Sequence, residues 1–257
     1  DQVKETLEVI ADDLQEDTVI MDTSPIRQAV TDWAQNLLPV GRSYVGLTPI
    51  INPEHLEDST SGIDAAHADM FERGIMAIAA GRSTPEHAIK AAASLTQLLG
   101  ASPFFADIAE VDGVMAAIQV LPQLSAAALL DATLDHPGWQ EARKFAGRAY
   151  LDGTSAAKTA FSSGALRDAA ILNPESVTRG LDRMIDSLQK VRGYVAKGDS
   201  EALGAMLGDI FEGREDWLAQ RLAAEWIIAS KVEMPASSGM MAQMFGFKAR
   251  KKPGEKK

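Results

Sequence analysis

Cysteine is absent from the 257 residues, and aromatic residues make up only 6% of them. Without cysteine the chain cannot form a disulfide, use a thiolate nucleophile or bind zinc or an iron–sulfur cluster through sulfur. Its four histidines follow no metal-ligand spacing such as HExxH, so no metal site is predicted. No uninterrupted run of about 18 apolar residues occurs, which predicts no transmembrane helix and no membrane partner.

Positive charge is also scarce, with 25 basic against 36 acidic residues and a net charge of -11. An acidic chain repels phosphate backbones, so we expect no nucleic-acid partner. The first residues lack the apolar core of a signal peptide, and a cytoplasmic location is expected. The remaining composition, 46% hydrophobic and 24% charged, is typical of a globular protein.

Several catalytic motifs are missing as well. The sequence contains no GxSxG elbow, no P-loop and no GxGxxG turn. If the protein uses a dinucleotide, the turn that binds its pyrophosphate is therefore not among these residues. The chain also lacks an initiator methionine and opens inside a helical pattern over residues 2–14, which predicts that sequence upstream is missing.

Residues 1–107 alternate between helical and strand patterns. Short apolar, β-branched runs predict strands, and longer periodic segments predict helices between them. This alternation predicts a mostly parallel α/β sheet. The strands are expected at residues 18–21, 43–47, 75–78 and 101–106, and the helices at residues 2–14, 24–37, 63–72 and 83–99.

After Asp107 the pattern becomes purely helical and rich in alanine. The predicted fold class is α/β followed by all-α: a partial Rossmann-like, dinucleotide-binding sheet domain and a C-terminal helical dimerisation domain. The domain limits are expected at residues 1–108 and 109–232, followed by a flexible basic tail over residues 233–257.

Polar residues follow two of the predicted strands, where ligands bind in open α/β sheets. Asp22, Thr23 and Ser24 follow the first strand, and Ser24 equally suits a plain helix cap. The segment 46–50, which contains Thr48 and Pro49, ends the second strand and leads through residues 59–62. These segments either line a ligand cleft or simply connect elements.

Two further candidates lie in the helical half. Pro122 interrupts a helical pattern and predicts a kink, beside which Gln119 and Gln123 could face a ligand; a solvated helix face is the alternative. Arg148 and Lys158 belong to a cationic stretch that an acidic substrate would need, although ordinary surface charge is the simpler interpretation.

The order of these features resembles the prephenate/arogenate dehydrogenase family of NAD(P)-dependent enzymes of tyrosine biosynthesis. Residues 22–27 resemble a strand end with the family pattern Asp-x-Gly-Ser-x-Lys, and residues 46–50 resemble its Gly-His-Pro-Met. Residues 61–62 followed by 70–71 are similar to a Ser-Gly and a later Leu-Phe.

The resemblance continues in the helical half and covers nearly residues 1–230. Residues 110–112 and 119–123 resemble a helix that carries Glu-His-Asp and then Ser-His-Leu-Pro-His. Arg167-Asp168 followed by Asn173 resembles an Arg-Asp…Asn pattern before a long helix.

The chain departs from the family at its catalytic positions. The family histidine that contacts the substrate hydroxyl falls on Thr48, and the family serine falls on Pro25, next to Ser24. The two helix histidines fall on Val111 and Gln123. Neither threonine nor glutamine is a general base near pH 7, although both can hydrogen-bond a substrate.

The resemblance implies a cofactor, NAD or NADP, a small acidic substrate and a homodimer. By position, Ser24 and Thr48 are the catalytic candidates, and Asp22, Thr23, Ser24 and Pro49 would contact the cofactor. The substrate would be bound by Gln119, Gln123, Arg148 and Lys158.

Two alternatives remain open at this point. One is a dehydrogenase of the same two-domain plan that acts on another small hydroxyacid, with Lys158 as its catalytic residue. The other is a non-catalytic ligand-binding or regulatory homologue. Both alternatives are consistent with the absence of the family's histidines from this chain.

Overall fold

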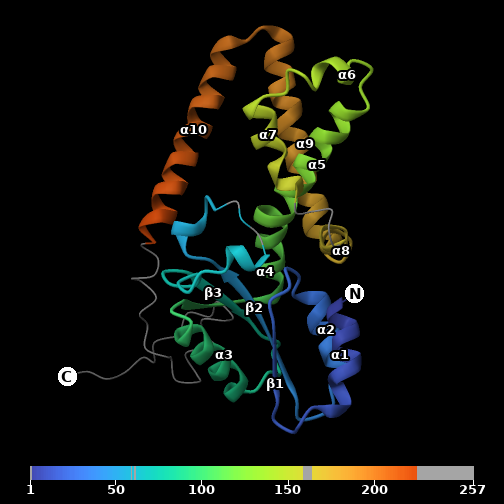
Figure 1. The fold of residues 1–257 in the computed structure, drawn as a ribbon, viewed down its shortest axis with the longest axis vertical. Coiled ribbons are helices and arrows are strands. Elements are labelled where there is room, and N and C mark those ends of the chain that lie inside the picture. Colours follow the sequence, from blue (N-terminus) through green and yellow to red (C-terminus); the bar gives the residue numbers. More distant parts are fainter. Residues whose placement is uncertain (1, 59, 61, 159–163, 225–257) are drawn as a thin grey trace, which may run out of the picture. The chain divides into compact units, whose positions relative to one another are not determined.

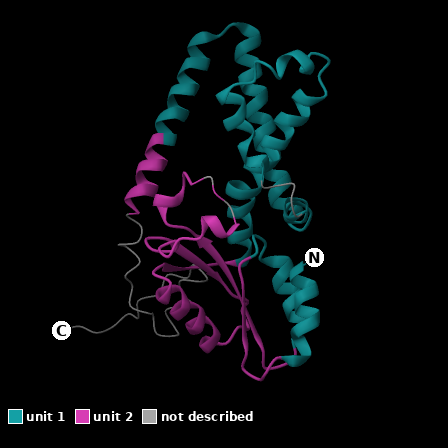
Figure 2. Ribbon diagram, viewed as in Figure 1, with its two compact units in different colours: residues 1–13, 24–38, 108–214 teal, residues 14–23, 39–107, 215–257 magenta. Residues whose placement is uncertain are grey.

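The computed structural model describes residues 2–58, 60, 62–158 and 164–224. Contacts divide the chain into two compact units, each built from separate stretches of sequence (Figure 2). The helical unit contains residues 1–13, 24–38 and 108–214, and the sheet unit contains residues 14–23, 39–107 and 215–257. The two units are described separately below.

The sheet unit is built on a four-stranded sheet with the order β1-β2-β3-β4 (Figure 1). The pairings β1–β2 and β3–β4 are parallel, whereas β2–β3 is antiparallel. The expectation of a mostly parallel sheet is confirmed, with one antiparallel pairing that the sequence did not predict. The strands are β1 (Val19–Asp22), β2 (Ser43–Ile50), β3 (Ile75–Ala79) and β4 (Ser102–Ala106).

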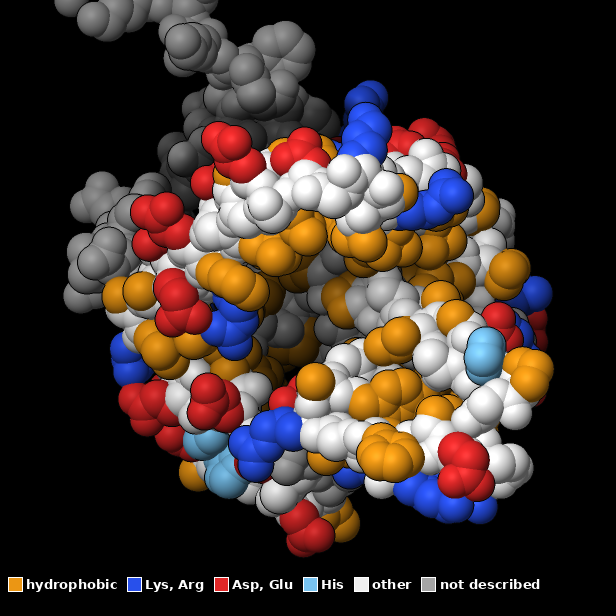
Figure 3. Space-filling model, turned by 90° about the horizontal axis from the view of Figure 1, so that it is seen from above, with side chains coloured by type: hydrophobic (Ala, Val, Ile, Leu, Met, Phe, Trp, Pro, Cys, Tyr) orange, Lys and Arg blue, Asp and Glu red, His pale blue; other side chains and the backbone are white. Residues whose placement is uncertain are grey.

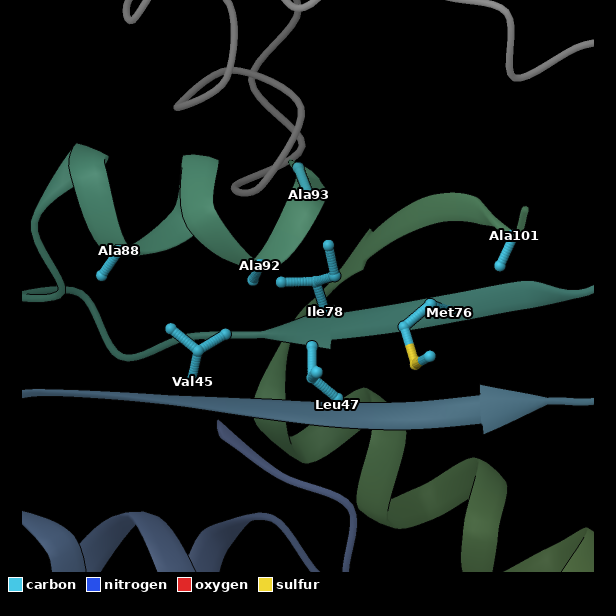
Figure 4. Close-up of a cluster of buried hydrophobic side chains, with 8 residues drawn as sticks. All are labelled: Val45, Leu47, Met76, Ile78, Ala88, Ala92, Ala93 and Ala101. Atoms are coloured by element: carbon cyan, nitrogen blue, oxygen red, sulfur yellow. The ribbon is translucent and has the colours of Figure 1, made fainter. Parts of the chain in front are cut away.

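Helix α3 (Glu86–Leu98) covers one face of this sheet (Figure 4). Its small residues Ala88 and Ala92 are fully buried and let the helix approach the strands closely. The strands contribute larger apolar side chains, because alternate residues of a strand point to the same face. The resulting core consists of Val45, Leu47, Met76, Ile78, Ala88, Ala92, Ala93 and Ala101.

The helical unit has its own apolar core. It centres on Ile26, Ala116, Val120, Ala169 and Val177. Its helices are α1 (Gln2–Ile10), α2 (Gln28–Leu37), α4 (Ile108–Met115), α5 (Leu121–Leu134), α6 (Trp139–Ala142), α7 (Arg148–Thr154), α8 (Ala165–Ile171), α9 (Pro174–Lys197) and the first part of α10 (Ser200–Ala223), with the short 3-10 helices η1 (Ala11–Asp13) and η5 (Ser155–Lys158).

Where the sequence predicts a kink at Pro122, the structure has a π-helical turn, η4 (Ala116–Val120), between α4 and α5. Pro122 lies in the first turn of α5, directly after the π turn, and has no N–H to donate to the preceding turn. The extra residue in the π turn therefore absorbs the proline without ending the helical run from Ile108 to Leu134. By length and composition alone, this run is long and apolar enough to cross a membrane. The sequence did not predict such a helix, because polar residues interrupt its apolar stretches.

Two expectations about helix limits were wrong. The segment expected as a helix over 63–72 forms the short 3-10 helix η3 (Gly62–Ala65) followed by turns. The side chain and backbone N–H of Asn52 bind the carbonyl groups of Asp69 and Met70 and so replace helical hydrogen bonds there. The second helix begins at Gln28 rather than Ser24.

The predicted fold class is confirmed: a Rossmann-like sheet domain precedes a helical domain. The domain limits 1–108 and 109–232 stay a prediction. Each compact unit of the structure is built from three separate stretches of sequence, so the units do not test a division at a single point of the chain. The predicted basic tail and the methionine-rich segment before it lie outside the described residues.

Candidate functional site

The polar residues predicted at the first strand end occupy the end of β1. Asp22 is its last residue and lies beside Gly46 of β2. The phenol of Tyr44, which is buried, donates a hydrogen bond of 3.0 Å to Asp22 Oδ2. Thr23 is exposed, whereas Pro49, in the neighbouring strand β2, is partly buried. This hydrogen bond joins Asp22, at the end of β1, to the beginning of β2.

Thr48 is the most constrained of the predicted site residues. Its side chain is only 5% exposed and belongs to the face of β2 opposite to Leu47, which packs under α3. Among the described residues, the Thr48 hydroxyl has no hydrogen-bond partner. A buried hydroxyl without a partner costs about 1–3 kcal/mol, so a bound group that hydrogen-bonds it would recover that free energy.

Ser24 lies in the turn before α2 and does not cap that helix. Its hydroxyl donates to the carbonyl of Ile26 at 3.2 Å. The first amides of α2 instead donate to Asp112 of α4: Arg27 N–H to Oδ1 at 2.6 Å and Gln28 N–H to Oδ2 at 2.9 Å. The sequence pattern predicted a local cap, whereas the actual cap comes from a residue about 85 positions away.

The predicted substrate-binding residues lie on the helical unit. Gln119 is exposed on η4, and Gln123 is partly buried on the first turns of α5. Arg148 begins α7 and is exposed, as is Lys158 at the end of η5. Their long cationic side chains are therefore accessible to an anion.

The predicted site residues are divided between the two units. The helical unit carries Ser24, Gln119, Gln123, Arg148 and Lys158. The sheet unit carries Asp22, Thr23, Thr48 and Pro49. Of the loop expected to continue from Thr48, Ser59 and Ser61 lie outside the described residues.

Sequence reasoning missed a histidine–aspartate cluster in the loop between β2 and β3. The rings of His55 and His67 stack with centroids 4.3 Å apart. His55 Nε2 lies 2.9 Å from Asp69 Oδ1, and His67 Nε2 lies 3.0 Å from Asp58 Oδ2. No sequence signal could have found this cluster, because the loop is irregular and has no periodicity.

The hydrogen bonds of this cluster lower the pKa of both carboxyl groups. His67, and then the backbone N–H of Thr60, lower the pKa of Asp58 to about 2. His55 lowers the pKa of Asp69. Ionised carboxylates only accept hydrogen bonds, so the Nε2–H group of each ring is the donor to its aspartate. Among the described residues, no group of three His, Asp or Glu could hold a metal ion.

The last turns of α10 are attached to the same loop within the sheet unit. Arg221, which is 6% exposed, donates from Nη2 to the carbonyl of Ile51. Arg73 donates to the carbonyl of Leu222 at 2.8 Å and pairs with Glu54 at 2.7 Å. Burial lowers the pKa of Arg221.

A Rossmann-like sheet with polar residues at its strand ends, followed by a helical domain, is the architecture of a class of two-domain dinucleotide-dependent proteins. Two family models match the chain: the prephenate dehydrogenase nucleotide-binding domain over residues 1–104, and the prephenate dehydrogenase dimerization domain over residues 107–209. The chain therefore belongs to the prephenate/arogenate dehydrogenase family.

Prephenate dehydrogenase of Bacillus subtilis (strain 168) is 28% identical over 194 residues, which cover 74% of this chain and 50% of that protein. The chain thus spans about half the length of this relative. Two solved structures share the fold. Prephenate dehydrogenase from Aquifex aeolicus in complex with hydroxyphenyl propionate and NAD+ has a TM-score of 0.71 at 20% identity, covering 83% of this chain and 72% of that one. Synechocystis arogenate dehydrogenase has a TM-score of 0.66 at 18% identity, covering 83% and 74%.

Proposed function

We propose that the protein is an NAD(P)-dependent oxidoreductase that oxidatively decarboxylates prephenate or arogenate, as in tyrosine biosynthesis. Membership of the family supports this activity. The observation that carries it is the buried hydroxyl of Thr48, which has no partner among the described residues. By the sequence resemblance, Thr48 corresponds to the family's catalytic histidine. A hydroxyl in that state suits a bound ligand.

The described residues fit one end of the cofactor. The hydroxyl of Thr48 can hydrogen-bond the nicotinamide end or the substrate hydroxyl, and Asp22, Thr23 and Pro49 lie in the same unit at the ends of β1 and β2. The pyrophosphate would need a Gly-rich turn, and the sequence contains none. When bound, NAD or NADP supplies the acceptor for the hydride that leaves the substrate ring.

The chain's own residues would orient the substrate and stabilise its charge. Gln119 and Gln123 have amide groups that can hydrogen-bond a substrate, and Arg148 and Lys158 can pair with its carboxylates. Thr48 cannot remove a proton near pH 7, so its role is to hold the reacting hydroxyl or a water molecule. Ser24, in the turn before α2, is proposed as a further contact to the cofactor.

A homodimer is part of the proposal and rests on the dimerization-domain match. Large apolar side chains are exposed along the two long helices, α9 and α10. Figure 3 shows hydrophobic side chains gathered on the face seen from above. The apolar run Ile108–Leu134 is only 17% buried in its most apolar window, as expected for a helix that packs against a second copy. The exposed residues of α9 and α10 include Ile185, Leu188, Val195, Leu207, Ile210, Phe211 and Trp217.

Light scattering at micromolar concentration tests this assembly. The wild-type chain is expected to have the mass of a dimer, and Phe211→Glu is expected to shift it towards the monomer, because a charge would enter an apolar interface. Glu201→Gln, an exposed change at the start of α10, is the control. A monomeric wild-type chain contradicts the proposal. The proposal also includes a cytoplasmic location.

The activity is tested by isothermal titration of NAD and NADP against this 257-residue chain and against the full natural gene product. Formation of NADPH or NADH with prephenate and arogenate is then followed by absorbance. Binding with turnover supports the proposed activity. Binding without turnover favours the non-catalytic homologue, and turnover only with other hydroxyacids favours the second dehydrogenase. Absence of binding by either form contradicts an NAD(P)-dependent function.

A further inference from the structure

Asp112 is a buried carboxylate with both oxygens engaged. It lies on α4, is 5% exposed and accepts the backbone N–H groups of Arg27 and Gln28 at 2.6 and 2.9 Å. These are the first amides of α2, whose own N-cap residue, Arg27, makes no side-chain capping bond. A carboxylate at a helix N-terminus forms charge-assisted hydrogen bonds and is favoured by the helix dipole. Asp112 therefore holds the start of α2 strongly.

The segment before α2 is attached to the same helical run by a second contact. Ile26 is 7% exposed and packs in the core of the helical unit with Ala116 and Val120. Ser24 donates its hydroxyl hydrogen bond to the carbonyl of Ile26. The turn that presents Ser24 is thus fixed by one polar and one apolar contact with the run that begins at Ile108.

Asp112 is itself held from its other side. The side-chain amide of Asn173, the residue before α9, donates a 2.9 Å hydrogen bond to the backbone carbonyl of Asp112. The helical run then continues from Asp112 to Gln119 and Gln123, seven and eleven residues further along. At a rise of about 1.5 Å per residue, the backbone positions of the two glutamines lie roughly 10 and 16 Å along the axis from that of Asp112.

We propose that Asp112 is a positioning residue that fixes the Ser24 turn relative to Gln119 and Gln123. This inference rests on the proposed function, in which Ser24 contacts the cofactor and the two glutamines contact the substrate. Asp112 joins these two sets of residues through the helical run from Ile108 to Leu134 rather than by touching a ligand. The same carboxylate occupies the amides at the N-terminus of α2 and so excludes a ligand anion from them.

The anchoring is tested first without any ligand, by amide hydrogen exchange of Arg27 and Gln28 measured by NMR. In Asp112→Asn one of the two backbone N–H groups loses its acceptor oxygen, and neither faces a negative charge any longer. The exchange of both amides is therefore expected to be about tenfold faster or more. Asn173→Ala is expected to act in the same direction and more weakly, which covers the case that Asp112→Asn does not fold. Asp182→Asn, an exposed change on α9, is the control. Unchanged exchange in both Asp112→Asn and Asn173→Ala would overturn the proposal.

The positioning is tested next in the full natural gene product, by a double-mutant cycle on NAD affinity with Ser24→Ala and Asp112→Asn. If Asp112 positions Ser24, Ser24→Ala weakens binding in the wild type but has little further effect in Asp112→Asn. A purely structural role predicts additive effects, and additivity overturns the proposal. If the full natural gene product binds no NAD, the proposed function fails, whereas the exchange measurement still decides whether Asp112 orders the turn.

Discussion

The imidazole rings of His55 and His67 stack almost in parallel, with an interplanar angle of 5°, and each ring is hydrogen-bonded to its own aspartate. The partners of the two rings are Asp69 and Asp58, respectively, and all four residues belong to the loop between β2 and β3. This loop follows Thr48 and carries the residues that bind the end of α10. The hydrogen bonds that hold this loop in place are therefore expected to affect the predicted site at Thr48.

The first prediction concerns the pH dependence of this loop. The pKa of Asp58 falls from 3.8 to about 2 in the folded protein, mainly through His67. Because this pKa is lowered on folding, the ionised Asp58 carboxylate stabilises the folded protein. This stabilisation is fully present above about pH 4 and is lost as the pH falls towards about 2. In His67→Ala the pKa of Asp58 is expected to rise towards 3.8, as measured by NMR titration of the carboxyl group. The exposed change His87→Ala is the control, and an unmoved Asp58 pKa in His67→Ala contradicts the assignment.

The second prediction separates the stability and binding effects of the Thr48 hydroxyl. Thr48→Val removes a buried hydroxyl that has no partner among the described residues, so the free energy of unfolding is expected to stay unchanged or to rise by about 1 kcal/mol. Affinity for NAD(P) or substrate is expected to fall about fivefold to tenfold, because the ligand loses a hydrogen bond.

Thr96→Val is the matched control for this change. Thr96 is fully buried in α3, and its hydroxyl donates to the carbonyl of Ala92. Its substitution is expected to leave ligand affinity unaltered. Urea unfolding and calorimetric titration measure the two quantities, and unaltered affinity in Thr48→Val would remove Thr48 from the site.

The third prediction concerns the attachment of α10 to the loop. Arg221→Met leaves the carbonyl of Ile51 without its charged donor and is expected to cost about 1.5–3 kcal/mol. Arg73→Met is expected to cost less, about 0.5–1 kcal/mol, because Arg73 and Glu54 are exposed. Hydrogen exchange of residues 215–224 should increase in both variants and not in Arg192→Met, an exposed change on α9. Equal protection in all three proteins would mean that these arginines do not hold the helix.

The fourth prediction concerns Gly74, which closes the loop before β3. A Cβ at this position would lie 2.5 Å from the carbonyl oxygen of Ile50 and 2.8 Å from that of Phe71. Because both atoms belong to the backbone, Gly74→Ala is expected to destabilise the protein by about 1–3 kcal/mol in urea unfolding. Gly213→Ala on exposed α10 meets nothing within 4 Å and is expected to stabilise by about 0.5–1 kcal/mol. Equal effects of the two changes would contradict the steric explanation.

Local patterns in the sequence determined where the strands and most helices lie. The apolar run predicted over residues 43–47 became part of β2, and the helix expected over residues 83–99 became α3. Gly100, in the left-handed region, follows two residues after the end of this helix. Such features depend on neighbours in the chain, whose hydrophobic period is written in the sequence. The ordered motifs from Asp22 to Asn173 likewise sufficed to identify the family.

Only the tertiary structure decided the contacts between residues far apart in the chain. Asp112 rather than Ser24 caps α2, Asn52 replaces a predicted helix with turns, and the Thr48 hydroxyl is buried without a partner among the described residues. The antiparallel pairing of β2 with β3 was equally absent from the local pattern. The physical reason is that capping, burial and strand pairing depend on which groups meet after the chain has folded, and hydrophobic periodicity carries no information about those partners.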